Sequence, residues 1–165
     1  MVRLEHVNLV MEDIQPTLDF LLIAFPHWKV RGEGEMVWGR GENAIPRHWL
    51  HVGDDDYYLT LNDNGQGENR DVSTVQVGVA HIGFVVDNLA QLISRLAKQG
   101  FTVDITGQDH PFRQTVYYND PAGFQFEFLQ YHSDKPEEKN MYGGESGHIV
   151  RKANDEISTT NRAIN

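Results

Sequence analysis

The sequence predicts an α+β fold built from two tandem modules, each running strand–helix–strand–strand–strand. The first observation is an internal repeat, in which residues 6–14 (HVNLVMEDI) align with residues 81–89 (HIGFVVDNL) at a constant offset of 75 residues. The second is that each copy leads into a run whose apolar residues recur at helical spacing. The third is that short runs typical of β-strands follow each of these helices.

The first module begins with the β-branched, apolar start of the repeat, which suits a strand. Asp13 can then cap a helix, and Pro16 falls in its first turn, where a missing N–H does little harm. The helical stripe consists of Ile14, Leu18, Leu21, Leu22 and Phe25. Three strands follow, over residues 28–32, 47–52 and 57–62, and the stretch 35–38 is expected to extend the second of them.

The second module repeats this order. Asn88 is the expected N-cap of its helix, and Gly100 is well placed to end it. The expected strands cover residues 101–106, 113–118 and 124–131. The last two are joined by Asn119-Asp120-Pro121-Ala122-Gly123, a composition typical of a tight turn.

The chain therefore divides into one domain and a tail. The domain spans residues 1–131 and holds the two modules, at about 4–62 and 79–131, with a polar, glycine-containing linker at 63–78. Residues 132–165 are rich in charged side chains of both signs and form a polar C-terminal tail with little core of its own.

Charge and composition exclude several classes of function. The formal net charge of −10 opposes binding to nucleic acids or anionic membranes. The absence of cysteine rules out disulfides, zinc–thiolate sites and a cysteine nucleophile. No run approaches 18 apolar residues, and the charged N-terminal stretch does not suit a signal peptide, so we expect a cytoplasmic protein.

Two histidines and one glutamate are candidate metal ligands. His6 and His81 begin the first strand of their respective modules, and alternation along residues 124–129 places Glu127 opposite the three phenylalanines, on the face away from the helix. If the modules pair about a pseudo-twofold axis, these three side chains converge as a two-histidine, one-carboxylate set that suits a divalent ion. The competing interpretation is that each histidine is an ordinary hydrogen-bonded strand residue.

Other polar side chains share the expected cavity face. Tyr58, Tyr117 and Gln125 are candidate catalytic residues, because each can hold or transfer a proton or donate a hydrogen bond. Candidate substrate-binding residues are His51, Thr60 and Arg113, of which the arginine could hold a carboxylate. Thr60 stands at the position in the first module that corresponds to Glu127 in the second. Each of these residues can also be a half-exposed strand residue without such a role.

Three motifs in order resemble the vicinal oxygen chelate superfamily, the glyoxalase/bleomycin resistance/dioxygenase family. They are His6-Val-Asn-Leu-Val before a helix, His81-Ile-Gly-Phe-Val-Val-Asp before a helix, and Tyr118-Asn-Asp-Pro-Ala-Gly-Phe-Gln-Phe-Glu127. The resemblance covers roughly residues 4–131. It implies that the paired modules form a half-open mixed β-barrel around one divalent metal ion held by His6, His81 and Glu127. The ligand types do not distinguish Fe, Mn, Zn, Ni and Co.

The resemblance leaves two functions open. One is an enzyme, a glyoxalase-like lyase or isomerase or an extradiol-type dioxygenase, that acts on a small oxygen-bearing substrate by Lewis-acid catalysis. The other is a metal-free protein that binds small molecules, in the manner of antibiotic-resistance members. Thr60 stands where glyoxalase I has a further glutamate ligand, which weighs against that specific activity. The resemblance also implies a homodimer, whose modules pair either within a chain or swapped between chains.

Overall fold

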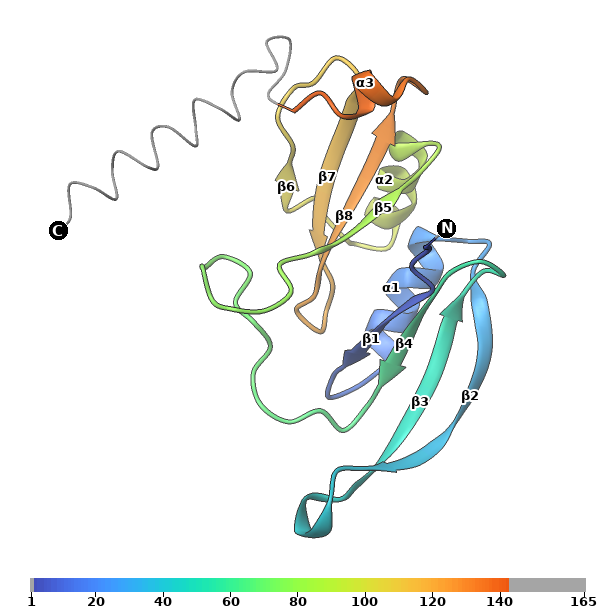
Figure 1. Ribbon diagram of the computed structural model, residues 1–165, viewed down its shortest axis with the longest axis vertical. Helices are drawn as coiled ribbons and strands as arrows, with labels where there is room; N and C mark the ends of the chain where they lie inside the picture. Colours follow the sequence, from blue (N-terminus) through green and yellow to red (C-terminus); the bar gives the residue numbers. More distant parts are fainter. Residues whose placement is uncertain (1, 143–165) are drawn as a thin grey trace, which may run out of the picture.

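Each half of the sequence folds into its own four-stranded mixed sheet in the computed structural model, which describes residues 2–142 (Figure 1). The first sheet has the order β1-β4-β3-β2 and contains β1 (His6–Val10), β2 (Lys29–Trp38), β3 (Ile45–Gly53) and β4 (Tyr58–Asn62). The second has the order β5-β8-β7-β6 and contains β5 (Ile82–Val85), β6 (Ile105–Thr106), β7 (Arg113–Asn119) and β8 (Gln125–Tyr131). The helices are α1 (Gln15–Ala24), α2 (Leu89–Lys98) and the short α3 (Pro136–Lys139), with a 3₁₀ turn at Gly41–Asn43.

The two sheets have the same topology, which confirms the predicted fold class. In each sheet the first strand runs parallel to the last, and the other pairs are antiparallel. Register supports the correspondence of Thr60 with Glu127: Thr60 lies opposite Asn8, and Glu127 lies opposite Gly83, the residue 75 positions after Asn8. None of the helices in residues 2–142 is long and apolar enough to cross a membrane.

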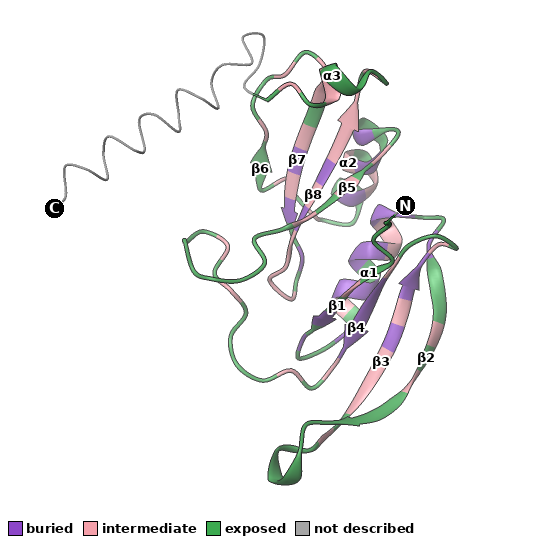
Figure 2. Cartoon of the chain, in the orientation of Figure 1, coloured by how far each residue is buried: buried purple, intermediate pink, exposed green. Residues whose placement is uncertain are grey.

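Helix α1 packs against the strands of both modules. Figure 2 shows buried residues along this helix, and they are Thr17, Leu18, Phe20, Leu21 and Ala24. The ring of Phe20 contacts Phe101 and Phe126 of the second module, with centroids 5.1 and 5.6 Å apart, and the ring of Phe25 lies 5.0 Å from Phe84. The sequence predicts a single buried stripe along this helix. The structure adds Thr17 and Phe20 as fully buried residues, because a second sheet covers the opposite side of the helix.

Two polar contacts reinforce this joint between the modules. The guanidinium of Arg95 on α2 donates to the carbonyls of Ile23 and Ala24 at the C-terminal end of α1, at 3.2 and 2.8 Å. The hydroxyl of Thr17 donates to the carboxylate of Asp120 in the turn before β8. The modules of one chain are thus held together through their helices and this turn.

The ends of α2 match the expected caps, whereas the N-cap of α1 lies one residue later than expected. The side chain of Asn88 accepts a hydrogen bond from the N–H of Gln91 at 2.9 Å, and Gly100 adopts a φ of 85° just after α2. Helix α1 begins at Gln15, with Ile14 at the N-cap position. Asp13 lies one residue earlier than a cap but still accepts the N–H of Gln15 at 2.9 Å.

Three strand predictions are wrong in detail. Residues 35–38 belong to β2 and not to β3, because β2 and β3 pair along nearly their whole lengths in one long hairpin. Of residues 101–106, only Ile105–Thr106 form a strand; Phe101 instead packs under Phe20. Tyr57, the first residue of the strand expected over 57–62, is exposed and lies in the turn before β4, which begins at Tyr58.

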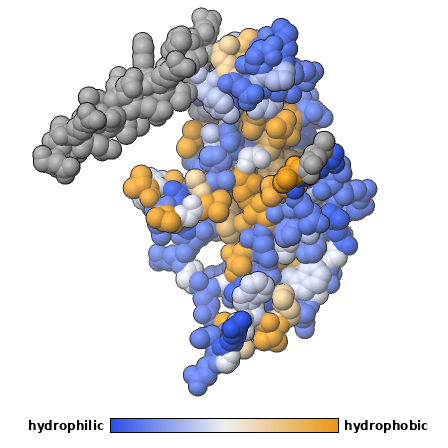
Figure 3. Space-filling view, in the orientation of Figure 1, coloured by the Kyte–Doolittle hydropathy of each residue, from blue (hydrophilic) through white to orange (hydrophobic). Residues whose placement is uncertain are grey.

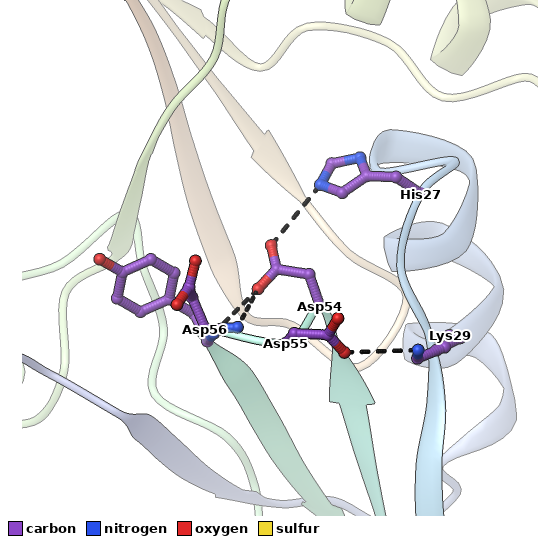
Figure 4. A network of polar contacts seen from close by, with 6 residues as sticks. His27, Lys29, Asp54, Asp55 and Asp56 are labelled. Carbon is purple, nitrogen blue, oxygen red and sulfur yellow. Dashed lines mark hydrogen bonds and ion pairs between the residues drawn. The ribbon is translucent and has the colours of Figure 1, made fainter.

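A group of aspartates builds the turn between β3 and β4 (Figure 4). The carboxylate of Asp54 accepts the backbone N–H groups of Asp56 and Tyr57, both at 2.9 Å, and lies 3.7 Å from the ring of His27. Asp55 pairs with Lys29 at 3.4 Å. Burial would raise the pKa of Asp54, but these N–H groups and the Trp28 side chain together hold the pKa below its usual value.

The first residues of the expected tail contact the second module. The N–H of His132 donates to the carbonyl of Phe112 at 2.8 Å, and the ring of His110 lies 2.7 Å from the carbonyl of Met141. Helix α3 lies between these contacts, and the Lys139 ammonium sits over the ring of Tyr131. Residues 143–165 lie outside the described residues.

Candidate functional site

The open face of the second sheet, which none of the helices in residues 2–142 covers, carries a histidine–carboxylate–tyrosine cluster. His81 lies just before β5, Glu127 is in β8 and Tyr117 is in β7, so three neighbouring strands bring them together. The Nε2 atom of His81 lies 3.2 Å from Oε2 of Glu127. The hydroxyl of Tyr117 donates to the other carboxylate oxygen, Oε1, at 3.0 Å.

A glycine leaves space for this cluster. Gly83 lies opposite Glu127 in the parallel pair of β5 and β8. A Cβ atom at residue 83 would lie 3.2 Å from Oε2 of Glu127, which is tighter than ordinary van der Waals contact. The absence of a side chain there lets the carboxylate lie beside His81, and the carboxylate remains only partly exposed.

Burial and the hydrogen bond to Glu127 both keep Tyr117 protonated. Burial, and then the hydrogen bond to Glu127 and its negative charge, raise the pKa of Tyr117 above the usual 10.0. The phenol therefore keeps its proton at neutral pH and acts as a donor. It holds one oxygen of Glu127 and leaves the other directed toward His81.

The open face of the first sheet carries a row of rings. The ring of His6 stacks on that of Tyr58 at 4.9 Å, Tyr58 lies 4.5 Å from His51, and His51 lies 4.9 Å from Trp49. The guanidinium of Arg31 sits 4.6 Å from the centre of the Tyr58 ring. These contacts fix the ring of His6 against the sheet.

The two nitrogens of His6 have different surroundings. Nδ1 lies 3.0 Å from a carboxylate oxygen of Glu5, which can only accept a hydrogen bond. With Nδ1 donating, the lone pair of a neutral His6 is on Nε2, as a metal ligand requires. His51, two strands away, has its pKa lowered by burial and then by the nearby charges of His6 and Arg31, so it favours the neutral form.

The other expected site residues have diverse settings. Thr60 is buried beside His51 and Asn8 in the sheet register. Gln125 lies 3.4 Å from both Asp104 and Asn119, at the far end of β8 from Arg113. Arg113 lies under the ring of Tyr142 and lines a cavity of about 730 Å³ between α2 and the segment before β7, away from both clusters.

The three expected metal ligands do not meet within one chain. His81 and Glu127 lie together, whereas His6 is in the ring row of the other sheet. Among residues 2–142, no three His, Asp or Glu side chains come close enough together to hold a metal ion. The imidazole nitrogen of His81 and the carboxylate oxygen of Glu127 lie 3.2 Å apart on the open face, and they supply two of the three ligands that such a metal site needs.

Some contributors to the site are absent from the sequence predictions. Glu5 contacts His6, and Arg31 contacts Tyr58. Strand alternation alone does not predict the contact of Arg31, because this residue lies at a register shift in β2. Gly83 did carry a signal: it lies two residues after His81, on the same face, where a missing side chain indicates close approach.

Comparisons with known proteins agree with this architecture. The sequence model of the Glyoxalase/Bleomycin resistance protein/Dioxygenase superfamily matches residues 3–128. None of the curated proteins is similar enough to this chain to count as a match.

Solved structures share the fold at low sequence identity. A glyoxalase family protein from Bacillus cereus has a TM-score of 0.62 at 15% identity, over 81% of this chain and 96% of the other. One from Enterococcus faecalis has a TM-score of 0.60 at 20% identity, over 77% and 96%. A glyoxylase/bleomycin resistance protein/dioxygenase domain from Frankia sp. EAN1pec has a TM-score of 0.57 at 23% identity, over 79% and 98%.

Proposed function

This chain belongs to the Glyoxalase/Bleomycin resistance protein/Dioxygenase superfamily, and we propose that it is a cytoplasmic, divalent-metal-dependent enzyme of that superfamily. Its substrate is a small molecule that presents oxygen atoms to the metal. The reaction is of the glyoxalase type, a lyase or isomerase step, or of the extradiol dioxygenase type. His6, His81 and Glu127 are the ligands, and the working unit is a pair of chains.

The observation that carries this proposal is the His81–Glu127 pair. A half-exposed imidazole lies 3.2 Å from a carboxylate that a tyrosine holds from its other side. When bound there, a divalent ion supplies Lewis acidity that stabilises negative charge on a substrate oxygen. Fe, Mn, Zn, Ni and Co all accept these ligand types.

The chain's own residues have separate tasks in this proposal. Tyr117 positions Glu127, and its raised pKa keeps the phenol available as a hydrogen-bond donor. His51, with a lowered pKa, is neutral at neutral pH and can accept a proton. The ring of Tyr58 lies between the rings of His6 and His51 and holds the ring of His6 in place. Thr60, opposite His51 in the sheet register, contacts substrate in this proposal, whereas Arg113 lines a cavity away from both clusters.

Metal analysis of the protein purified without chelator tests this function. We expect about one divalent ion per chain, as for a site with three protein ligands. The variant His81→Ala should lose most of it, because the remaining ligands cannot hold the ion alone.

The matched control is His48→Ala. His48 is 38% exposed and lies 3.0 Å from Glu33, much as His81 is 39% exposed and lies 3.2 Å from Glu127. Its loss should leave the metal content unchanged. A native protein without metal that still binds small molecules would refute the enzyme and favour the antibiotic-binding function.

A further inference from the structure

The long hairpin of β2 and β3 extends beyond the rest of the first sheet. Strand β4 pairs with β3 only over residues 49–53, so residues 45–48 of β3 pair with β2 alone. Figure 3 shows hydrophobic side chains exposed at this lower end of the molecule. Alternation along the two strands places four large side chains here on the open face of the sheet. We call them the hairpin face, and they are Met36, Trp38, Arg47 and Trp49.

Arg47 is a cation without an anionic partner on the hairpin face. Its Nε atom is buried and has no hydrogen-bond partner among the residues that the structure describes. None of the ion pairs within residues 2–142 includes this side chain. The acidic residues of β2, Glu33 and Glu35, lie on the other face of the hairpin. Because a buried donor without an acceptor is costly, this guanidinium is suited to receive an anion from outside the chain.

Two indole rings flank the guanidinium. Its central carbon lies 5.7 Å from the centre of the Trp38 ring, and Trp38 is 47% exposed. On the other side, the indole of Trp49 reaches across to β2, where a Cβ atom at Gly34 would lie 3.0 Å from it. The missing side chain of Gly34 thus lets this ring lie close against the strand. Aromatic rings beside an unpaired guanidinium suit a ligand that is both planar and negatively charged.

We propose that the hairpin face binds a planar aromatic carboxylate, which pairs with Arg47 and packs its ring against Trp38 and Trp49. A carboxylate accepts two parallel hydrogen bonds from a guanidinium, and one of the donors is the Nε–H that has no partner within the described chain. Arg47 is four residues from His51 along β3, which is about 13 Å at the usual rise of a strand. The site is therefore separate from the proposed metal ligands, needs no metal and goes beyond the proposed function.

Titration calorimetry with 1-naphthoate, on the full chain kept free of metal by a chelator, tests the ligand class. 1-Naphthamide has the same rings without the charge, and cyclohexanecarboxylate has the same charge without a planar ring. We expect naphthoate to bind about tenfold more tightly than either, because only naphthoate uses both the guanidinium and the indoles. Equal affinity for the three compounds, or no binding of naphthoate, would overturn the inference and leave the proposed metal function intact.

The variant Arg47→Gln tests the position of the charge. We expect about a tenfold loss of affinity for naphthoate and little change for naphthamide, since only the first ligand pairs with the guanidinium. Arg40→Gln is the matched control, because Arg40 is an exposed arginine in the turn of the same hairpin. Arg31, which sits over the ring of Tyr58, offers a second arginine beside an aromatic ring. A loss in Arg31→Gln without a loss in Arg47→Gln would refute the hairpin face as the site.

The variant Trp38→Ala tests the ring contact. We expect it to weaken the binding of naphthoate and naphthamide about fivefold each, because both lose an indole to pack against. Val37→Ala is the matched control, since Val37 is 68% exposed but lies on the opposite face of β2. Circular dichroism checks that each variant keeps its fold. Unchanged naphthoate affinity in folded Trp38→Ala would show that the ring does not pack there and would overturn the inference.

Discussion

At the scale of single residues, Asp120 shows how a buried carboxylate joins distant parts of the chain. Its oxygens accept the Thr17 hydroxyl and the N–H of Phe124, and burial raises its pKa above the usual 3.8. The folded state thus binds this proton more tightly than the unfolded chain does. The stability that this carboxyl contributes is complete below the unfolded pKa and is lost as pH rises through the folded pKa.

The variant Asp120→Asn should remove that pH dependence. An asparagine keeps an acceptor for Phe124 and can donate its amide to Thr17, so folding is retained. We expect the free energy of unfolding, measured with urea across the acidic range, to become flatter above pH 3.8 than in the wild type. Asp109→Asn, at an exposed site, is the control. An unchanged slope in Asp120→Asn would contradict the assignment.

At the scale of elements, the turn between β3 and β4 depends on Asp54, whose pKa shift has the opposite sign. Because hydrogen bonds hold the pKa of Asp54 below 3.8, its contribution is present above that value and is lost as pH falls through the lowered pKa. Asp54→Ala should cost about 1–2 kcal/mol at neutral pH, since two turn N–H groups lose their acceptor.

The neighbouring variant Asp55→Ala is the comparison. Asp55 is 92% exposed and pairs only with Lys29, so we expect its loss to cost about 0–1 kcal/mol. Urea unfolding of both variants at neutral and acidic pH measures the difference. Equal costs for Asp54→Ala and Asp55→Ala would show that the turn hydrogen bonds contribute nothing.

The sequence predicts most elements because their signals are local. The repeat beginning at His6 and His81, the cap at Asn88 and the glycine at Gly100 each need only a few neighbouring residues. The sequence does not predict the full extent of β2, because that extent depends on pairing with β3. The separation of His6 from Glu127 also has no local signal, since it follows from how the two modules dock through α1.

At the scale of the whole molecule, α1 is the shared core of both modules. Phe20 is fully buried and contacts four rings of the second module: Phe101, Tyr118, Phe126 and Phe128. Phe20→Ala should cost about 3–5 kcal/mol in urea unfolding. It should also speed amide hydrogen exchange in β8, although β8 belongs to the other sheet.

Trp38→Ala is the control for this substitution, because Trp38 is a large but exposed aromatic residue on β2. We expect it to change stability little and to leave exchange in β8 as in the wild type. If Phe20→Ala affected only the first module, the docking of the two modules through α1 would be refuted.

The contacts of Phe20 also limit how far the sequences of the two halves can change independently of each other. Its neighbours lie in the second half of the chain, so a substitution in α1 changes the packing of strands that come much later in the sequence. A recombinant that joined the first half of this chain to the second half of a distant relative would inherit mismatched aromatic surfaces. The duplicated halves, though equal in topology, are therefore no longer interchangeable parts.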